Sequence, residues 1–282
     1  MVNIENLSFA FKKNQPLFKG LNLKLQAGKT YGLFGLNGAG KTTLLNHMSG
    51  SLFPASGRCT INGVEVRERL PQTMSEIFIV PEQFDLPPIL PAEFIDLHAP
   101  FYPRFDINQI EDIMKQFHLD REKKLSEQSY GQRKKFLIAF AIATNTNILL
   151  MDEPTNGLDI PSKSQFRKIM AQTNREERCT VISTHQVRDL ESMIDRLTVL
   201  HNGSIIFDQT IEEMSESLTF KRVKEHESAG KIYGEPTLGG ENVIVPRRSD
   251  HEDTQIDLEL LFNAIIESTG LINNEFKSEV LS

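Results

Sequence analysis

The first third of the chain has the apolar and polar pattern of β-strands interrupted by one helix. Residues 1–34 are strand-rich and end in the short apolar run 30–34, and residues 57–66 read as a further hairpin. From Thr43 onward the sequence TLLNHMSGSL looks helical instead. The pattern therefore predicts a strand at 30–34 that turns into a helix through the glycine-rich residues between them.

The middle of the chain changes to a helix pattern and then returns to strands. Residues 84–145 begin with several prolines and continue with helix-period stretches such as 107–117, so this segment should be mainly helical. Residues 134–143 are apolar on nearly every face, which predicts a buried helix. Apolar strand patterns follow at 148–152, 179–183 and 196–207, and His201-Asn202-Gly203 predicts a hairpin turn within the last of them. This order predicts an α/β fold.

The pattern changes again beyond Asp208. Residues 211–223 look helical, residues 226–255 are rich in glycine, proline and charge, and residues 256–266 form an amphipathic helix candidate. We interpret residues 209–282 as an accessory extension.

Composition and charge restrict the partners. Of 31 basic and 38 acidic side chains, residues 211–282 hold 7 and 15, so the acidic excess belongs to the extension. Such an extension disfavours contact with a phosphate backbone, and no nucleic-acid partner is expected. The sequence has no run of about 18 apolar residues and no signal-type amino terminus, which predicts a cytoplasmic protein. Cys59 and Cys179 lack metal spacing and are expected to be buried thiols.

Residues 35–42 read GLNGAGKT, the full pattern of a phosphate-binding loop. Glycines let the backbone bend around phosphate, and N–H groups at a helix start direct partial positive charge at its oxygens. Lys41 would reach the same oxygens, and the Thr42 hydroxyl would bind Mg²⁺. The expected nucleotide contacts here are Gly35, Asn37, Gly38, Ala39, Gly40, Lys41, Thr42 and Thr43.

A carboxylate pair ends the apolar run 148–152. Asp152 would hold Mg²⁺ together with Thr42, and Glu153 beside it would be available as a base for water. Pro154 stops the strand and exposes Glu153 at its carboxyl end, where ligands of open α/β sheets bind. No Asn-Lys-x-Asp guanine signature occurs in the chain, so ATP is the expected nucleotide.

The sequence QSYGQ at 128–132 resembles the Leu-Ser-Gly-Gly-Gln signature of the ATP-binding subunits of ABC transporters. Gln132 stands 20 residues before Asp152, the offset that this family shows. A rival register at 125–129 keeps Leu-Ser but puts Glu and Gln where glycines belong, and we reject it on spacing. The chosen register has Gln and Tyr at its first and third positions, which are departures from the signature.

The resemblance implies a P-loop NTPase core of ABC type over residues 1–208. This core would contain an N-terminal antiparallel β subdomain and a helical subdomain at about 84–145, and residues 209–282 would form a short C-terminal extension.

In the resembled family two chains face each other head to tail around two Mg-ATP. The partner would be a second copy of this chain or a paralogous ATPase subunit. The signature residues expected to contact the ATP of the partner subunit are Ser129, Gly131 and Gln132. Residues 155–159 resemble the D-loop segment, whose last residue, Asp159, would reach across the dimer. His185 resembles the switch histidine that contacts the γ-phosphate and orients the attacking water.

Two further positions match the family with an alternative. Phe11 matches the aromatic residue that stacks on adenine, and Phe9 is the alternative. Glu82 matches the glutamine of the Q-loop, which senses Mg²⁺ and the transmembrane partner, and Gln83 is the alternative. With Thr42 and Asp152, Glu82 completes the expected metal ligands.

The resemblance implies an ATP-hydrolysing subunit that drives a separate transmembrane permease from the inner face of the cell membrane. Similar short tails that end in an acidic and apolar helix occur in ATPase subunits of exporters, which favours export. In the family the helical subdomain receives a coupling helix of the membrane subunit. The aromatic residues that would line this groove or pack in the core are Phe84, Phe94, Phe101, Tyr102 and Phe105. The main alternative is a soluble ATPase of the same type that remodels a non-membrane partner, and a degenerate nucleotide-binding regulator is a third reading.

Overall fold

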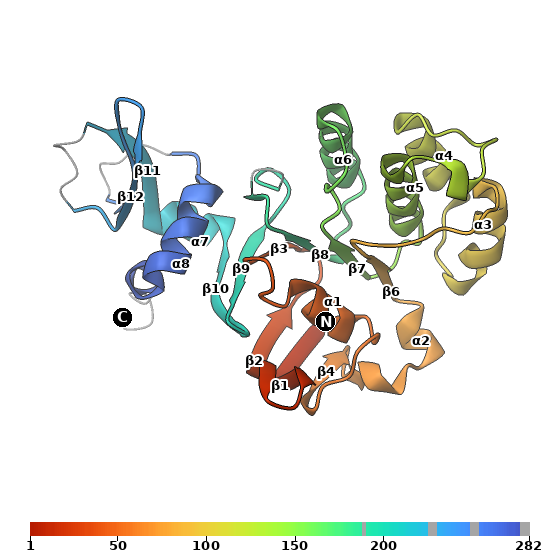
Figure 1. Cartoon of the computed structure of the whole chain (residues 1–282), viewed down its shortest axis with the longest axis horizontal. Helices are drawn as coiled ribbons and strands as arrows, with labels where there is room; N and C mark the ends of the chain where they lie inside the picture. Colours follow the sequence, from red (N-terminus) through yellow and green to blue (C-terminus); the bar gives the residue numbers. More distant parts are fainter. Residues whose placement is uncertain (188–189, 225–229, 249–253, 277–282) are drawn as a thin grey trace.

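The computed structural model describes residues 1–282 except 188–189, 225–229, 249–253 and 277–282. The described residues form three β-sheets of four, six and three strands, with helices packed around them (Figure 1). The expected α/β fold with an antiparallel β subdomain at its amino terminus is confirmed.

The amino-terminal sheet has the strand order β2-β1-β4-β5 and is antiparallel. Its strands are β1 Val2–Lys12, β2 Gln15–Leu25, β4 Ser56–Ile61 and β5 Val64–Glu65. Along β2 the side chains of Leu21, Leu23 and Leu25 are buried and those of Asn22 and Lys24 are exposed. This alternation gives the sheet one apolar face, because successive side chains of a strand point to opposite sides.

The central sheet has the order β10-β9-β3-β8-β7-β6 and is parallel except for its β9–β10 hairpin. Its strands are β3 Thr30–Phe34, β6 Ile77–Val80, β7 Ile148–Asp152, β8 Cys179–Thr184, β9 Arg196–His201 and β10 Ser204–Thr210. Every residue of β3, β7 and β8 is buried, as in strands covered on both faces. Asn202 and Gly203 have φ of 47° and 75°, the left-handed values that a tight hairpin turn needs.

Helices cover this sheet and form the middle segment. They are α1 Lys41–Met48, α2 Pro71–Met74, α3 Pro91–His98, α4 Ile107–Gln116, α5 Tyr130–Ala143 and α6 Ile160–Gln172. Short 3-10 turns lie at Val66–Glu68, Ala99–Phe101 and Leu125–Glu127. The strand-to-helix step around the glycine loop and the helical character of 84–145 are therefore confirmed.

The helix α5 is the buried centre of the helical segment, which lies beyond the β6 edge of the sheet (Figure 1). Phe94 of α3 packs edge-on against Phe136 and Phe140 of α5, with ring centroids 5.3 and 5.2 Å apart. Of the other aromatic residues considered for a surface groove, Phe84, Tyr102 and Phe105 are partly buried against this core, whereas Phe101 is exposed.

The extension differs from its prediction, because residues 211–223 are not one helix. Helix α7 covers only Ile211–Ser217. The following residues form an antiparallel sheet of order β11-β13-β12, with β11 Leu218–Val223, β12 Tyr233–Thr237 and β13 Gly240–Pro246. Apolar and polar residues alternate only briefly in β11, so the local pattern does not predict a strand. These residues form a strand because they pair with β13, a segment distant in sequence. The amphipathic helix candidate is α8, Leu258–Asn274.

The extension packs toward the β10 edge, away from α3, α4 and α5 (Figure 1). The Phe262 ring of α8 meets the Phe34 ring of β3 at a centroid distance of 6.3 Å, and both belong to the same buried apolar cluster. The expected boundary at 208/209 falls inside β10, and the division into domains stays a prediction. In the described part of the chain no helix combines the length and apolar character needed to cross a membrane.

Candidate functional site

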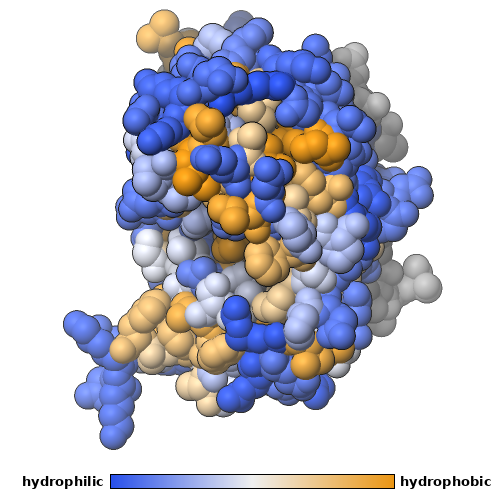
Figure 2. Space-filling view, turned by 90° about the vertical axis from the view of Figure 1, so that its right-hand side faces the viewer, coloured by the Kyte–Doolittle hydropathy of each residue, from blue (hydrophilic) through white to orange (hydrophobic). Residues whose placement is uncertain are grey.

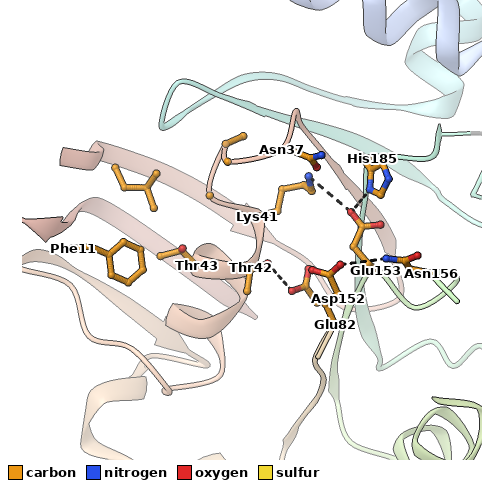
Figure 3. Close-up of a pocket in the computed structure, with 14 residues that line it drawn as sticks. Phe11, Asn37, Lys41, Thr42, Thr43, Glu82, Asp152, Glu153, Asn156 and His185 are labelled. Carbon is orange, nitrogen blue, oxygen red and sulfur yellow. Dashed lines mark hydrogen bonds and ion pairs between the residues drawn. The ribbon is translucent and has the colours of Figure 1, made fainter. Parts of the chain in front are cut away.

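An open cleft of about 680 Å³ lies where the carboxyl ends of β3, β7 and β8 meet the start of α1 (Figure 3). Its lining comes from segments far apart in the sequence. The lining residues are Phe11, Leu17, Asn37, Gly38, Ala39, Gly40, Lys41, Thr42, Thr43, Glu82, Asp152, Glu153, Asn156 and His185. Most of them are nucleotide, metal or catalytic residues that the sequence predicts.

The glycine loop between β3 and α1 forms one wall of this cleft. Gly38 and Gly40 have φ of 81° and 107°, and a Cβ on Gly40 would lie 2.9 Å from the Phe18 ring, so the loop needs glycine there. Lys41 Nζ donates to the carbonyl of Gly35 at 2.7 Å. Gly35 itself does not line the cleft. The loop and the start of α1 thus place backbone N–H groups and an ammonium beside the cleft, the chemistry that binds phosphate.

Thr42 and Asp152 face each other across the base of the cleft. The Thr42 hydroxyl donates to Asp152 Oδ2 at 2.6 Å, and the Ser183 hydroxyl donates to the other carboxylate oxygen. Asp152 is fully buried at the end of β7. The Ser183 contact was not predicted from the sequence, because it depends on β7 and β8 being paired side by side.

Glu153 has an unusual backbone that aims its carboxylate into the cleft. Its φ is 46°, a left-handed value that costs a residue other than glycine about 1–3 kcal/mol. Its Oε1 lies 2.8 Å from His185 Nδ1 and 4.0 Å from Lys41 Nζ, and its Oε2 accepts from the Thr184 hydroxyl at 3.2 Å. The structure therefore brings Glu153, His185 and Lys41 together, as Figure 3 shows.

Burial affects the charge of Lys41. Burial lowers the pKa of its ammonium, and the carboxylates of Glu153, Asp152 and Glu82 oppose this shift. The ammonium is buried beside the rim of a cleft that is open to solvent. A polyphosphate bound in the cleft would add negative charge near the Lys41 ammonium. That charge would raise the pKa of Lys41, because a nearby opposite charge favours the charged form.

At the Q-loop position Glu82, and not Gln83, lines the cleft. Its Oε1 accepts from Asn156 Nδ2 at 3.3 Å. Asn156 lies in the turn after Pro154 and also lines the cleft, but it was not singled out from the sequence. Its position in the D-loop segment was the only signal, because the contact with Glu82 joins residues 74 positions apart.

At the adenine position Phe11 lines the cleft and Phe9 does not. The Phe11 ring is 68% exposed, which leaves a flat face free for stacking. Phe9 packs edge-on against Phe11 and against His47, with ring centroids 4.9 and 4.7 Å apart. These positions favour Phe11 over Phe9 as the stacking residue, which stays a prediction.

The remaining predicted residues lie outside this cleft. Ser129 caps α5, where its hydroxyl accepts from the Gln132 N–H at 3.3 Å and the Gln132 side chain accepts from the Ser129 N–H at 3.1 Å. Asp159 caps α6 by accepting from the Ser162 N–H at 2.9 Å. None of these residues lines the cleft, and neither does Gly131. Within one chain the signature and the glycine loop are therefore not brought together.

The oxygen donors of the cleft fit Mg²⁺. Thr42, Asp152 and Glu82 offer a hydroxyl and two carboxylates beside the glycine loop. Mg²⁺ prefers such oxygens and usually takes one or two protein carboxylates together with phosphates and water. Among the described residues, no cluster of three or more His, Cys, Asp or Glu side chains could hold a metal ion by itself.

Comparisons with known proteins identify a family. The family model described as "ABC transporter" matches residues 18–156. The ABC transporter ATP-binding protein YtrB of Bacillus subtilis is 29% identical over 77% of this chain and 74% of its own length. The methionine import ATP-binding protein MetN of Carboxydothermus hydrogenoformans is 30% identical over 76% of this chain and 67% of its own length.

Solved structures agree on the fold. The ATP-binding subunit of an ABC transporter superposes with a TM-score of 0.69 at 24% identity, covering 76% of this chain and 91% of that one. The ATP-binding cassette MJ0796, solved as a dimer bound to ADP and Pi, gives a TM-score of 0.66 over 75% of this chain and 99% of that one. The glycine loop, the Asp152–Glu153 pair and these similarities lead to one conclusion: the chain belongs to the family of ABC transporter ATP-binding proteins and is an ATPase.

Proposed function

We propose that two copies of this chain, or this chain and a paralogous subunit, close head to tail around two Mg-ATP and thereby drive a separate permease. The observation that carries the proposal is the split of the expected machinery within one chain. Lys41, Thr42 and Glu153 line one cleft, whereas Ser129 and Gly131 lie outside it. A site that needs both halves would be completed by the signature of the partner subunit.

The chemistry proposed for the closed site is positioning plus electrostatic stabilisation. Lys41 and the N–H groups of the glycine loop bind the β- and γ-phosphates, and Phe11 stacks on the adenine. Glu153 polarises the attacking water, and His185, 2.8 Å from the Glu153 carboxylate, orients it. Mg²⁺ held by Thr42, Asp152 and Glu82 would neutralise phosphate charge. Phosphoryl transfer asks for little covalent chemistry from the protein, so such dispersed groups are sufficient.

The helical segment supplies the proposed docking surface for the permease. Figure 2 views the molecule from the side that carries α3, and apolar surface gathers over the upper part of this face. The exposed apolar side chains of the segment include Leu97, Phe101 and Ile107. An exposed apolar patch with a polar rim is typical of a protein–protein contact. This contact would hold the chain on the inner face of the cell membrane.

Export is the proposed direction of transport. It rests on the acidic and apolar helix at the end of the extension, as in ATPase subunits of exporters. Relatives with similar identity are named for methionine import, for phosphonate import and for bacitracin transport, so direction has to be measured on the assembled transporter.

Co-purification tests this function. Tagged Glu153→Gln chain is expressed in the native cell, held with ATP and Mg²⁺, extracted gently with detergent, and its bound proteins are identified by mass spectrometry. A multi-span membrane protein in stoichiometric amount is expected. The control is the same variant with Lys41→Ala added, which should recover less of that protein because the phosphate ligand is lost.

A soluble partner without any membrane protein would overturn the transporter proposal and support an ATPase that remodels a non-membrane partner. ATP turnover by the purified wild-type chain would argue against a regulator that only binds nucleotide.

A further inference from the structure

Two motif positions at which the chain departs from the family pattern, Tyr130 and Glu82, are in contact. Tyr130 stands where the signature has its first glycine, and Glu82 stands where the Q-loop has glutamine. The Tyr130 hydroxyl donates to the backbone carbonyl of Glu82 at 2.6 Å, although the two residues are 48 positions apart. A glycine at position 130 could not make this hydrogen bond.

Lys134, one turn further along α5, binds the same segment. Its Nζ lies 3.2 Å from the carbonyl oxygens of both Pro81 and Glu82 and 5.5 Å from the centre of the Phe84 ring. The side chain is fully buried. Burial lowers the pKa of the ammonium to about 8, and the carboxylates of the cleft, Asp152 first, oppose this shift. Burying an ammonium group is costly unless it is hydrogen-bonded, so Lys134 needs the carbonyl oxygens of Pro81 and Glu82 as partners.

The Tyr130 ring is itself held between two loops. It lies against Phe84, with ring centroids 5.6 Å apart, and a Cβ on Gly157 would approach it to 2.8 Å. The other end of Glu82 is also fixed, because its carboxylate accepts from Asn156 in the same loop as Gly157. The first two turns of α5 therefore hold the main chain of Glu82, while the D-loop segment holds its carboxylate.

We propose that Tyr130 and Lys134 are positioning residues that keep the Glu82 carboxylate at the metal side of the cleft. The reason is electrostatic. Glu82 lines the same cleft as Asp152 and Glu153, and repulsion between like charges favours turning its carboxylate away from them, although Lys41 and Lys134 offset part of that repulsion. Anchoring its carbonyl to α5 limits that withdrawal. The proposal rests on the proposed function, because it takes Glu82 as a ligand of Mg²⁺.

The test compares Tyr130→Phe with Tyr233→Phe. Both changes delete one phenolic hydroxyl that donates to a glutamate oxygen, but Tyr233 bonds Glu235 in the extension. Binding of a β,γ-imido analogue of ATP is measured with Mg²⁺ and with EDTA, at protein concentrations where light scattering gives a monomer. In Tyr130→Phe the gain in affinity from Mg²⁺ should fall about fivefold, the effect of one ordinary hydrogen bond. Affinity in EDTA should not change.

Hydrogen exchange gives a readout that does not depend on metal. The amides of residues 82–86 should exchange faster in Tyr130→Phe and in Lys134→Met, and at the wild-type rate in Tyr233→Phe. In a Glu82→Ala background, Tyr130→Phe should cause no further loss of the Mg²⁺ effect.

Two results would overturn the positioning role. One is an equal loss of affinity with and without Mg²⁺, which indicates a merely structural tyrosine. The other is unchanged exchange at 82–86. If Glu82→Ala alone leaves the Mg²⁺ effect intact, the metal role of Glu82 fails first, and the inference falls with it.

Discussion

At the scale of single residues, Glu153 is held by its backbone and by its neighbours in the cleft. It is buried, its φ is positive, and both carboxylate oxygens have a neighbour, His185 Nδ1 on one side and the Thr184 hydroxyl on the other. Backbone strain of this kind persists where the surrounding structure holds it, and it gathers at functional sites. The geometry presents Glu153 as an acceptor beside a phosphate-binding loop.

Glu153→Gln should lower steady-state ATP hydrolysis at least about 100-fold, because the amide cannot act as a base. ATP affinity should stay within about threefold of the wild type, since Lys41 and the glycine loop remain. Phosphate release and equilibrium binding measure the two quantities.

Glu177→Gln is the control, because Glu177 is exposed outside the cleft. Turnover of Glu153→Gln within about threefold of the wild type would remove Glu153 from the base role.

At the scale of elements, α5 begins with a capping box that has a counterpart elsewhere. Ser129 and Gln132 exchange hydrogen bonds at the start of α5, and Thr210 and Glu213 do the same at the start of α7. A polar cap satisfies N–H groups that the helix itself leaves without a partner. The two boxes have the same geometry, but only the first belongs to the signature.

Ser129→Ala and Thr210→Ala should each lower the free energy of unfolding by about 1 kcal/mol, measured by denaturant titration. Only Ser129→Ala should also weaken the ATP-dependent dimer of Glu153→Gln chains, measured by light scattering. If both changes weaken the dimer equally, Ser129 acts only as a helix cap and does not contact the ATP of the partner subunit.

At the scale of the whole molecule, the extension and the nucleotide-binding part share buried apolar contacts. Leu261 and Ile265 of α8 are completely buried in the cluster that contains Phe34, the last residue of β3. The glycine loop begins at the next residue. Loss of packing under α8 is therefore expected to affect the stability of the sheet that positions the loop.

Leu261→Ala should lower the free energy of unfolding by about 2–5 kcal/mol through the cavity it leaves. Its matched control is Leu271→Ala on the same helix, where the side chain is 55% exposed and the change should stay within about 0.5 kcal/mol. Unfolding followed by circular dichroism should show a single transition, and bound nucleotide should stabilise the chain against that same transition. A separate early transition of the extension alone would show that it is energetically independent.

Strong local patterns made much of this fold predictable. The run 30–34, the glycine loop and the hairpin around Asn202–Gly203 are determined within a few residues, so single-sequence reasoning found them. The prediction of a helix over residues 218–223 was wrong because these residues pair with β13, 18–28 positions further along the chain, and β-propensity depends on such packing. Asn156 was passed over for the same reason, since its partner Glu82 comes from another strand end.

The sequence by itself predicted that this protein is an ATPase of the ABC type, because residues 35–42 have the full pattern of a phosphate-binding loop and a carboxylate pair follows at 152–153. Only the tertiary structure decided which of Glu82 and Gln83 lines the cleft, and that Tyr130 bonds the Q-loop. It also decided that the extension adds a sheet and packs α8 under β3. The physical reason is range: motifs and caps act between neighbours in sequence, whereas these contacts join segments that only the packed core brings together.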